Sequence, residues 1–346
     1  PHLLRFNERI SIDGIDASDA SLMQAFQAVE AARAEVSLTY FEFTTLAALW
    51  LFQQQWVDVV VLEVGMGGRL DAVNIIEPDV SVITTVDFDH MAYLGNTLEA
   101  IANEKAGICR REKPVILADA EKLALLESAA DKHKANLISV GKSYHFQHRD
   151  RVFSYRYSNT QINCAAPTLG ADLVAAGLTA FLTAFSHLSL DSAKLVSAVE
   201  NAHLIGRWQQ IMDERTSYLD IGHNGQASRR LAEKAAAVHD GTWHIVLGML
   251  GDKDRQAVLA PWIAKSWKGG KIHWYLADLS GPRAGLATEI KAELPIEAWV
   301  SCFSDPVLAW QAAKLGATPE QPILVFGSFL TVAMVLEAWQ SNVSAR

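Results

Sequence analysis

The sequence has few cysteines, no long hydrophobic run and no excess of positive charge. Its three cysteines, Cys109, Cys164 and Cys302, are too widely spaced in 346 residues for a zinc motif or a disulfide framework. The longest apolar stretch, 323–336, is interrupted by polar residues and is too short to span a membrane. A formal net charge of −9 argues against nucleic acid or an anionic membrane as a partner. The sequence shows no signal-peptide pattern at its start. We therefore expect a cytoplasmic protein with reduced thiols that binds neither nucleic acid nor a membrane.

The composition is that of an ordinary globular protein, with 50% hydrophobic and 20% charged residues. A length of 346 residues favours two domains. In the first half, short apolar runs alternate with amphipathic segments, which predicts a mostly parallel, doubly wound α/β sheet. The predicted strands are 57–63, 80–86, 115–118 and 137–140, and the predicted helices are 21–34, 45–54, 97–106 and 122–133.

The pattern changes after residue 144. Residues 145–157 alternate polar and apolar side chains, which predicts an antiparallel hairpin appended to the sheet, followed by helices at 170–186 and 192–202. A second βα series then begins, with predicted strands at 217–221, 243–249, 273–277, 298–303 and 323–327. We therefore expect one α/β domain over 1–208 and a smaller, Rossmann-like α/β domain over 209–346, with a ligand cleft between them.

The stretch 57–71, VDVVVLEVGMGGRLD, predicts a strand that is buried on both faces and ends at a carboxylate, Glu63. Because burying an isolated ionised carboxylate is costly, Glu63 is expected to face a cation or hydrogen-bond donors at the end of the strand. An ion pair with Arg69 or contact with a helix N-terminus satisfies it equally well. Three glycines follow at 65, 67 and 68, as in loops that approach a ligand closely, but the third glycine of a dinucleotide fingerprint is missing.

Two further polar residues, His90 and Lys105, follow along the chain. His90 comes after the predicted strand 80–86, so it is expected at the same sheet edge as Glu63, where the pair can hold Mg²⁺. A hydrogen-bonded loop histidine is the plainer interpretation. Lys105 lies in the last turn of a helix that we expect to be capped by Asn96. Its plainer interpretation is a solvated lysine that complements the helix dipole.

In order and spacing, these segments resemble the folylpolyglutamate synthase family of the Mur ligase superfamily, especially its bacterial bifunctional dihydrofolate synthase/folylpolyglutamate synthases. The matching segments are PHLLRFNERI (1–10), TYFEF (39–43), LEVGMGGRLDAVN (62–74), LGNTLEAIANEKAGI (94–108), GRWQ (206–209), GMLGDKD (248–254), LSGPRA (279–284) and FGSFLTVA (326–333). The resemblance implies a Mur-ligase-like fold and a monomeric ligase that uses ATP and Mg²⁺. In the family, ATP phosphorylates a carboxylate of dihydropteroate or a reduced folate, and the amine of L-glutamate attacks the acyl phosphate.

The resemblance also implies roles for residues of the first domain. Glu63 and His90 match the family's magnesium ligands. Lys105 matches a lysine that the family carries as a carbamate, which turns a cation that repels Mg²⁺ into an anion that supports it. The expected contacts to the pteroate and its pterin ring come from two segments and comprise Thr39, Phe41, Arg69, Asp71 and Ala72.

In the second domain, the resemblance assigns four residues to ATP. Arg207 matches an arginine near the phosphates, and Asp220 matches an acidic residue that takes the ribose hydroxyls. His223 and Asn224 are expected beside the nucleotide. With these matches, we assign catalysis to His90, Lys105 and Arg207.

The family's glycine-rich phosphate loop lies upstream of the segment that matches residues 1–10, so we expect this sequence to begin downstream of that loop. The sequence Gly141, Lys142, Ser143 imitates part of such a loop, but Asn136 occupies the position of its first glycine. Activity is therefore expected to need the upstream segment. Three alternatives stay open: an inactive folate-binding relative, a cell-wall amino-acid ligase of the same superfamily, and a nicotinamide-dependent oxidoreductase.

Overall fold

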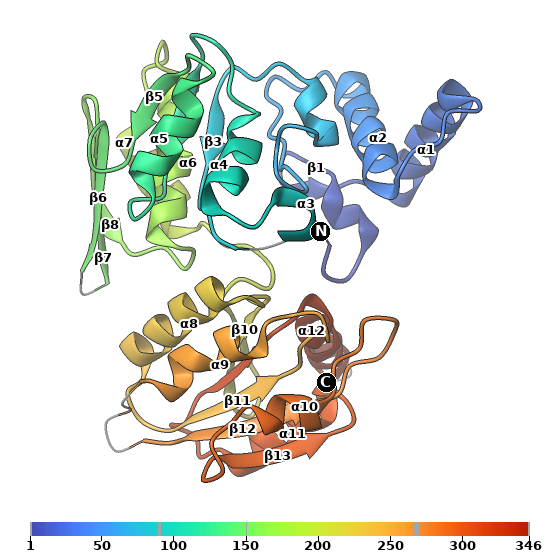
Figure 1. Ribbon diagram of the computed structural model, residues 1–346, viewed down its shortest axis with the longest axis vertical. Coiled ribbons are helices and arrows are strands. Elements are labelled where there is room, and N and C mark those ends of the chain that lie inside the picture. Colours follow the sequence, from blue (N-terminus) through green and yellow to red (C-terminus); the bar gives the residue numbers. More distant parts are fainter. Residues whose placement is uncertain (1, 89–90, 150, 266, 268–269, 345–346) are drawn as a thin grey trace. The chain divides into compact units, whose positions relative to one another are not determined.

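The computed structural model describes residues 2–88, 91–149, 151–265, 267 and 270–344 (Figure 1). The chain divides into two compact units, Pro1–Ala202 (unit 1) and His203–Arg346 (unit 2), whereas the sequence analysis places the boundary at residue 208. Among the described residues, no helix combines the length and the apolar character needed to cross a membrane.

Unit 1 begins with two packed helices, α1 (Asp19–Arg33) and α2 (Tyr40–Gln54), preceded by η1 (Phe6–Arg9) and a short hairpin of β1 (Ser11–Ile12) and β2 (Ile15–Asp16). Helix α2 begins earlier than the predicted helix 45–54, because the segment TYFEF forms its N-cap and first turn. The Thr39 hydroxyl accepts a hydrogen bond from the Glu42 backbone, and the Glu42 carboxylate accepts one from the Thr39 backbone at 2.6 Å. This capping box fixes the helix start.

The prediction of a buried strand at 57–63 is wrong. These residues form no strand with any described part of the chain, and Val59, Val60 and Val61 are 52%, 43% and 88% exposed. Glu63 is exposed as well. A β-branched run has the propensity for a strand, but a strand forms only where a neighbour supplies backbone hydrogen bonds. Within the described residues, no such neighbour lies beside this run.

A three-stranded parallel sheet of β3 (Ser81–Ile83), β4 (Pro114–Leu117) and β5 (Asn136–Ser139) confirms the alternating βα prediction. Side chains of β4 alternate between the two faces, as in any strand. Val115 and Leu117 pack with α4 (Leu98–Ala106) and α5 (Leu123–Asp131), and Ile116 packs with α6 (Ala171–Ala184). Helix α4 begins one residue later than expected, because Thr97 caps it instead of Asn96.

The hairpin predicted at 145–157 is present as β6 (Tyr144–Arg149) and β7 (Val152–Tyr157). It belongs to a separate antiparallel sheet that includes a third strand not predicted from the sequence, β8 (Thr160–Ala165). Phe153, Tyr155 and Ile162 of this sheet pack with residues of α6 and of α7 (Ser192–Glu200). Helix α6 contacts both three-stranded sheets of unit 1.

Unit 2 is built on a six-stranded sheet with the order β13-β12-β11-β14-β10-β9. Its strands are β9 (Gln209–Met212), β10 (Thr216–Asp220), β11 (Trp243–Leu247), β12 (Ile272–Ala277), β13 (Trp299–Phe303) and β14 (Ile323–Phe326), and its helices are α8 (Gly225–Val238), α9 (Arg255–Ile263), α10 (Ala287–Ala292), α11 (Pro306–Gly316) and α12 (Phe329–Ser344). All five predicted strands are present and parallel, and β9 is an additional antiparallel edge strand. Because β14 returns between β11 and β10, the strand order reverses there, which is where open α/β sheets bind ligands.

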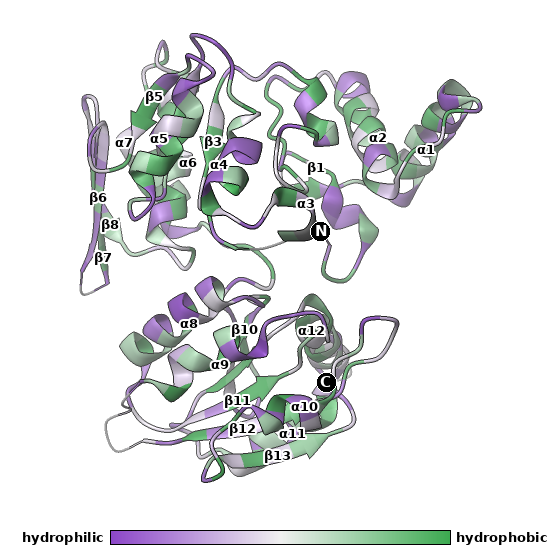
Figure 2. Cartoon of the chain, in the orientation of Figure 1, coloured by the Kyte–Doolittle hydropathy of each residue, from purple (hydrophilic) through white to green (hydrophobic). Residues whose placement is uncertain are grey.

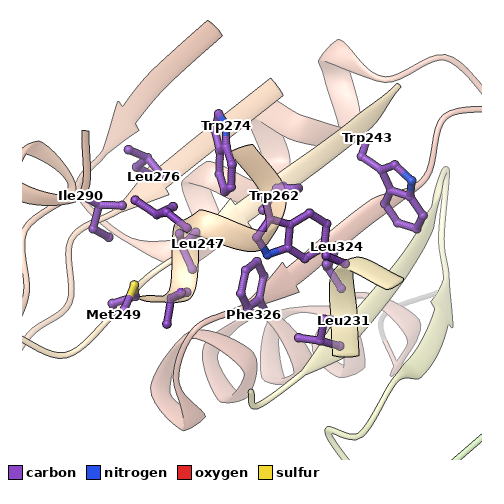
Figure 3. Packing of buried hydrophobic residues seen from close by; sticks show 14 of the residues in the cluster. Leu231, Trp243, Leu247, Met249, Trp262, Trp274, Leu276, Ile290, Leu324 and Phe326 are labelled. Carbon is purple, nitrogen blue, oxygen red and sulfur yellow. The ribbon is translucent and has the colours of Figure 1, made fainter. Parts of the chain in front are cut away.

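The core of unit 2 is rich in large aromatic residues. Trp243 and Trp274 from the strands meet Trp262 of α9 and Phe326 of β14 in one buried cluster (Figure 3). Figure 2 shows that β11 is mostly hydrophobic, in agreement with five buried residues in succession. A sheet buried in this way is a rigid support for the loops at its strand ends.

Candidate functional site

The glycine loop of unit 1 packs tightly against the C-terminal end of α4. A Cβ atom at Gly68 would lie 2.8 Å from the carbonyl oxygen of Glu104 and 3.0 Å from that of Lys105. Arg69 donates through its guanidinium to the Glu104 carboxylate at 3.0 Å and through its backbone to the Glu104 carbonyl at 2.9 Å. These glycines therefore serve close packing onto α4, and the loop is held next to the turn that carries Lys105.

Asp71 organises the same loop through its carboxylate. It accepts hydrogen bonds from the backbone of Gly65 at 2.9 Å, of Met66 at 3.0 Å and of Val73 at 3.0 Å. The last bond caps η2 (Ala72–Ile75), so Ala72 stands directly after the capping residue. The ring of Phe41 lies so close to Gly65 that a Cβ there would be 2.9 Å from the ring. The structure thus brings Phe41 and Asp71 together beside Gly65.

Thr39 belongs to a different surface. It lines a hollow of about 480 Å³ whose lining is rich in aromatic rings and comprises Phe6, Phe26, Glu30, Arg33, Ser37, Leu38, Thr39, Tyr40, Phe43 and Thr44. Phe41 is not part of this lining. Thr39 and Phe41, which the resemblance assigned to one ligand, therefore face different surroundings. The Thr39 hydroxyl is also engaged in capping α2.

The predicted metal ligands are only partly described. His90 lies outside the described residues, and Lys105 is half-buried in the last turn of α4. Glu63 makes no hydrogen bond or ion pair with any residue that the structure describes, and Arg69, its alternative partner, pairs with Glu104 instead. The described ranges contain no cluster of three or more His, Cys, Asp or Glu residues suited to a metal. An exposed carboxylate such as Glu63 still fits Mg²⁺, which takes one or two carboxylates and keeps several waters.

In unit 2, Asp220 ends β10 and points back to the turn before β9. Its carboxylate accepts hydrogen bonds from the backbone of Trp208 and of Gly222, each at 2.8 Å. Burial raises the pKa of Asp220, and these two amides together with the charges of Arg207 and Lys234 oppose that rise. Arg207 itself is exposed. Arg207 therefore lies close enough to Asp220 for its charge to act on that carboxylate.

His223 and Asn224 occupy the loop between β10 and α8. The Asn224 side chain accepts a hydrogen bond from the Ala227 backbone at 2.9 Å and so caps α8. His223 Nδ1 lies 3.0 Å from the Ile221 carbonyl oxygen, and its ring centroid lies 6.2 Å from that of Phe329 at the start of α12. Both residues thus stand at the carboxyl ends of β10 and β14, where the strand order reverses.

Three of the segments that carried the resemblance converge at this edge of unit 2. Arg283 pairs with Asp252, and the Arg283 carbonyl accepts from the Gly251 backbone at 3.0 Å, which ties LSGPRA to GMLGDKD. The Thr331 hydroxyl donates to the Gly248 carbonyl at 2.8 Å, which ties FGSFLTVA to the same loop. Segments far apart in the sequence are therefore joined around one end of the sheet.

Several residues that hold the predicted site residues in place were not predicted from the sequence. Glu104 binds Arg69, and Trp208 binds Asp220 through its backbone. Glu104 precedes Lys105 in the sequence, and Trp208 follows Arg207. Both lie within segments that match the family, and this was the sequence signal that could have pointed to them. Lys234 lies outside every matched segment, and only the fold places it near Asp220.

Two protein-family models match the chain: Mur ligase middle domain over residues 19–182, and Mur ligase, glutamate ligase domain over residues 206–329. The chain is 36% identical over 339 residues to the dihydrofolate synthase/folylpolyglutamate synthase of Escherichia coli (strain K12), covering 97% of this chain and 78% of that protein. Its structure is similar to E. coli FolC in complex with DHPP and ADP, with a TM-score of 0.92 and 35% identity over 99% of this chain and 81% of that chain. It is also similar to the bifunctional enzyme of Yersinia pestis complexed with AMPPNP and Mn ion, with a TM-score of 0.90 and 35% identity over 98% of this chain and 80% of that chain.

These matches confirm the resemblance read from the segments and the Mur-ligase-like α/β fold that it implied. The two family models together cover most of both units. The chain belongs to the dihydrofolate synthase/folylpolyglutamate synthase family of ATP-dependent ligases, within the Mur ligase superfamily.

Proposed function

We propose that this protein ligates L-glutamate to dihydropteroate and to reduced folates, using ATP to convert a substrate carboxylate into an acyl phosphate. One observation carries the proposal: a relative that is 36% identical over 97% of this chain is named dihydrofolate synthase/folylpolyglutamate synthase. Of the solved relatives, one is in complex with DHPP and ADP and another with AMPPNP and Mn ion. Both are consistent with a ligase that takes ATP, a divalent metal and a pteroate.

In unit 1, we assign Mg²⁺ to Glu63 and His90, with Lys105 as a carbamate that supports the site. The exposed carboxylate of Glu63 supports this assignment. When bound, the metal ion neutralises phosphate charge during phosphoryl transfer. Phe41 offers a ring face for the pterin, and Asp71 shapes the loop on which Arg69 and Ala72 lie. Thr39 keeps its predicted role as a substrate contact.

In unit 2, we assign the nucleotide to Arg207, Asp220, His223 and Asn224. The exposed guanidinium of Arg207 suits phosphate oxygens, which it binds with a planar set of donors. A carboxylate offers about four acceptor positions, so Asp220 retains acceptors for ribose hydroxyls beyond its two backbone amides.

We also propose that the protein is monomeric and cytoplasmic. Light scattering after size exclusion tests the first property, and cell fractionation tests the second.

The decisive experiment measures glutamate-dependent phosphate release from ATP with dihydropteroate, using the full-length protein. Glutamylated product is identified by mass, and a nucleotide-sugar peptide offered as substrate tests the cell-wall ligase alternative. Glu63→Gln is expected to abolish release, whereas the matched control Glu297→Gln, exposed and remote in sequence, keeps it. Binding of dihydropteroate without any turnover by the folded wild-type protein would overturn the proposal in favour of an inactive folate-binding relative.

A further inference from the structure

Trp208 has an unusual backbone conformation in the turn before β9. Its φ angle is 47°, in the left-handed region that non-glycine residues rarely adopt. The side chain is buried, and its ring stacks on Tyr218 with centroids 4.8 Å apart and lies 6.5 Å from that of Trp243 (Trp243 is shown in Figure 3). Its backbone donates to Asp220 at 2.8 Å. Because the conformation is strained, surrounding contacts have to hold it.

The conformation of Trp208 decides where Arg207 points, since the two residues are consecutive. The turn is attached to the end of β10 at two places: by the hydrogen bond from Trp208 to Asp220, and by one from the Ile221 backbone to the Gly206 carbonyl at 2.9 Å. Trp208 and Asp220 therefore both restrain the backbone that carries Arg207.

Lys234, on α8, interacts with both the Trp208 ring and the Asp220 carboxylate. Its ammonium lies 4.9 Å from the centroid of the Trp208 ring, which is the geometry of a cation–π interaction. Its charge also acts on the Asp220 carboxylate. Lys234 is half-buried, so these interactions are less weakened by water than those of an exposed pair.

From this geometry we propose that Lys234 is a positioning residue for the nucleotide: by binding the Trp208 ring and the Asp220 carboxylate together, it holds Arg207 in its binding orientation. The inference rests on the proposed function of Arg207 and Asp220. It adds a residue that no matched segment contains, and it assigns that residue no contact with the nucleotide.

The pH dependence of this arrangement follows from the charges around it. Burial lowers the pKa of Lys234 to about 8, against the opposing charge of Asp220. Arg207 is the other charged group acting on Asp220. On α9, which packs against α8, Arg255 is paired with Glu289, and Asp254 caps the helix through the Ala257 backbone. Lys234 is thus the member of this set that loses its charge just above neutral pH.

The test measures ADP binding to the full-length protein by calorimetry between pH 6.5 and pH 9.5. Lys234→Arg keeps a positive charge over this range, and Lys234→Met keeps an apolar side chain of similar length without charge. Lys291→Met, at an exposed lysine on α10, is the matched control. Lys234→Met is expected to weaken ADP binding about tenfold at pH 7, the effect of roughly one cation–π or charged contact.

In the wild-type protein, affinity should fall as the pH rises through about 8. Lys234→Arg should bind as tightly at pH 7 and lose this alkaline fall, and Lys234→Met should bind weakly at every pH. If the fall persists in Lys234→Arg, or if Lys234→Met binds like the control, the inference is overturned. Comparison of wild type with Lys234→Arg stays decisive even if Lys234→Met fails to fold.

One further variant separates this inference from the function on which it rests. Arg207→Ala is expected to weaken ADP binding in its own right. Wild-type protein that binds no ADP overturns both the nucleotide assignment and the role of Lys234. Weakening by Arg207→Ala with no effect of either Lys234 variant overturns the role of Lys234 alone.

Discussion

The Asp71 carboxylate accepts a hydrogen bond from the backbone of Gly65, six residues earlier, at 2.9 Å. The same oxygen accepts from Met66, and the other oxygen accepts from Val73. One side chain thus closes the loop that links the exposed Glu63 to η2. A residue that the resemblance assigned to substrate contact therefore has a structural duty in this chain, and its replacement tests both.

Asp71→Ala is expected to lower the free energy of unfolding of unit 1 by about 1–3 kcal/mol, because three backbone amides lose their acceptor. It should also raise the KM for dihydropteroate in the full-length protein. Urea unfolding and steady-state kinetics measure the two effects. Asp16→Ala, at an exposed residue of β2, is the control and should change neither. An unchanged unfolding midpoint in Asp71→Ala would contradict this account of the loop.

Gly107→Ala tests the packing of the glycine loop on α4. A Cβ at this position would lie 2.4 Å from the Arg69 Cβ and 2.5 Å from its Cα, so the two backbones have to separate. We expect a loss of about 1–3 kcal/mol in the free energy of unfolding. Gly177→Ala in α6 is the matched control, since nothing lies within 4 Å of the added Cβ. That variant should gain about 0.5–1 kcal/mol from helix propensity, and equal effects of the two would refute the packing argument.

His244 makes the stability of unit 2 dependent on pH. It is buried in β11, with its ring nitrogens 3.0 Å from the Tyr275 hydroxyl and 3.0 Å from Gln321 Oε1. Burial lowers its pKa below the ordinary value of 6.5; the bond to Gln321 opposes the shift, and His273 adds to it. The unfolded state therefore binds the proton more readily, and stability present above pH 6.5 is lost as the pH falls below that value.

The measurement is the urea midpoint of unit 2 unfolding between pH 7.5 and pH 5. The wild-type midpoint should decrease on acidification below about pH 6.5, and His244→Gln should show a smaller decrease from a lower starting value. His148→Gln, at an exposed position of β6, controls for the loss of an imidazole. A wild-type slope that His244→Gln leaves intact would assign the effect to another group.

Lys314 and Asp213 form an ion pair that is almost fully buried, at 2.8 Å, with Lys314 also 4.0 Å from the centre of the Trp310 ring. Lys314→Met removes the buried cation beside Asp213 and is expected to cost about 3 kcal/mol of unfolding free energy. Lys113→Met breaks an exposed pair with Asp79 and should cost less than about 1 kcal/mol. Thermal and urea unfolding compare the two, and similar costs would show that burial is not the deciding factor.

Local patterns predicted most of the regular structure. The buried strand β14 is an uninterrupted apolar run, and helix ends carry capping residues, so both signals lie within a few residues of the element itself. The same reasoning failed at 57–63, although residues 59–62 are all apolar. A strand also needs a partner, and whether a partner lies alongside depends on parts of the chain that the run does not contain.

The features of the candidate site also fall into two groups, those that the sequence determined and those that the tertiary structure decided. The amino-acid sequence by itself determined the family, the order of the βα units and the identity of the matched residues, because these reside in residue types and their spacing. Only the tertiary structure decided that Arg69 pairs with Glu104, thirty-five positions away, and that Lys234 lies over Trp208. Such contacts depend on which surfaces meet when the chain folds, and residues far apart in sequence carry no local signal of a meeting that packing creates.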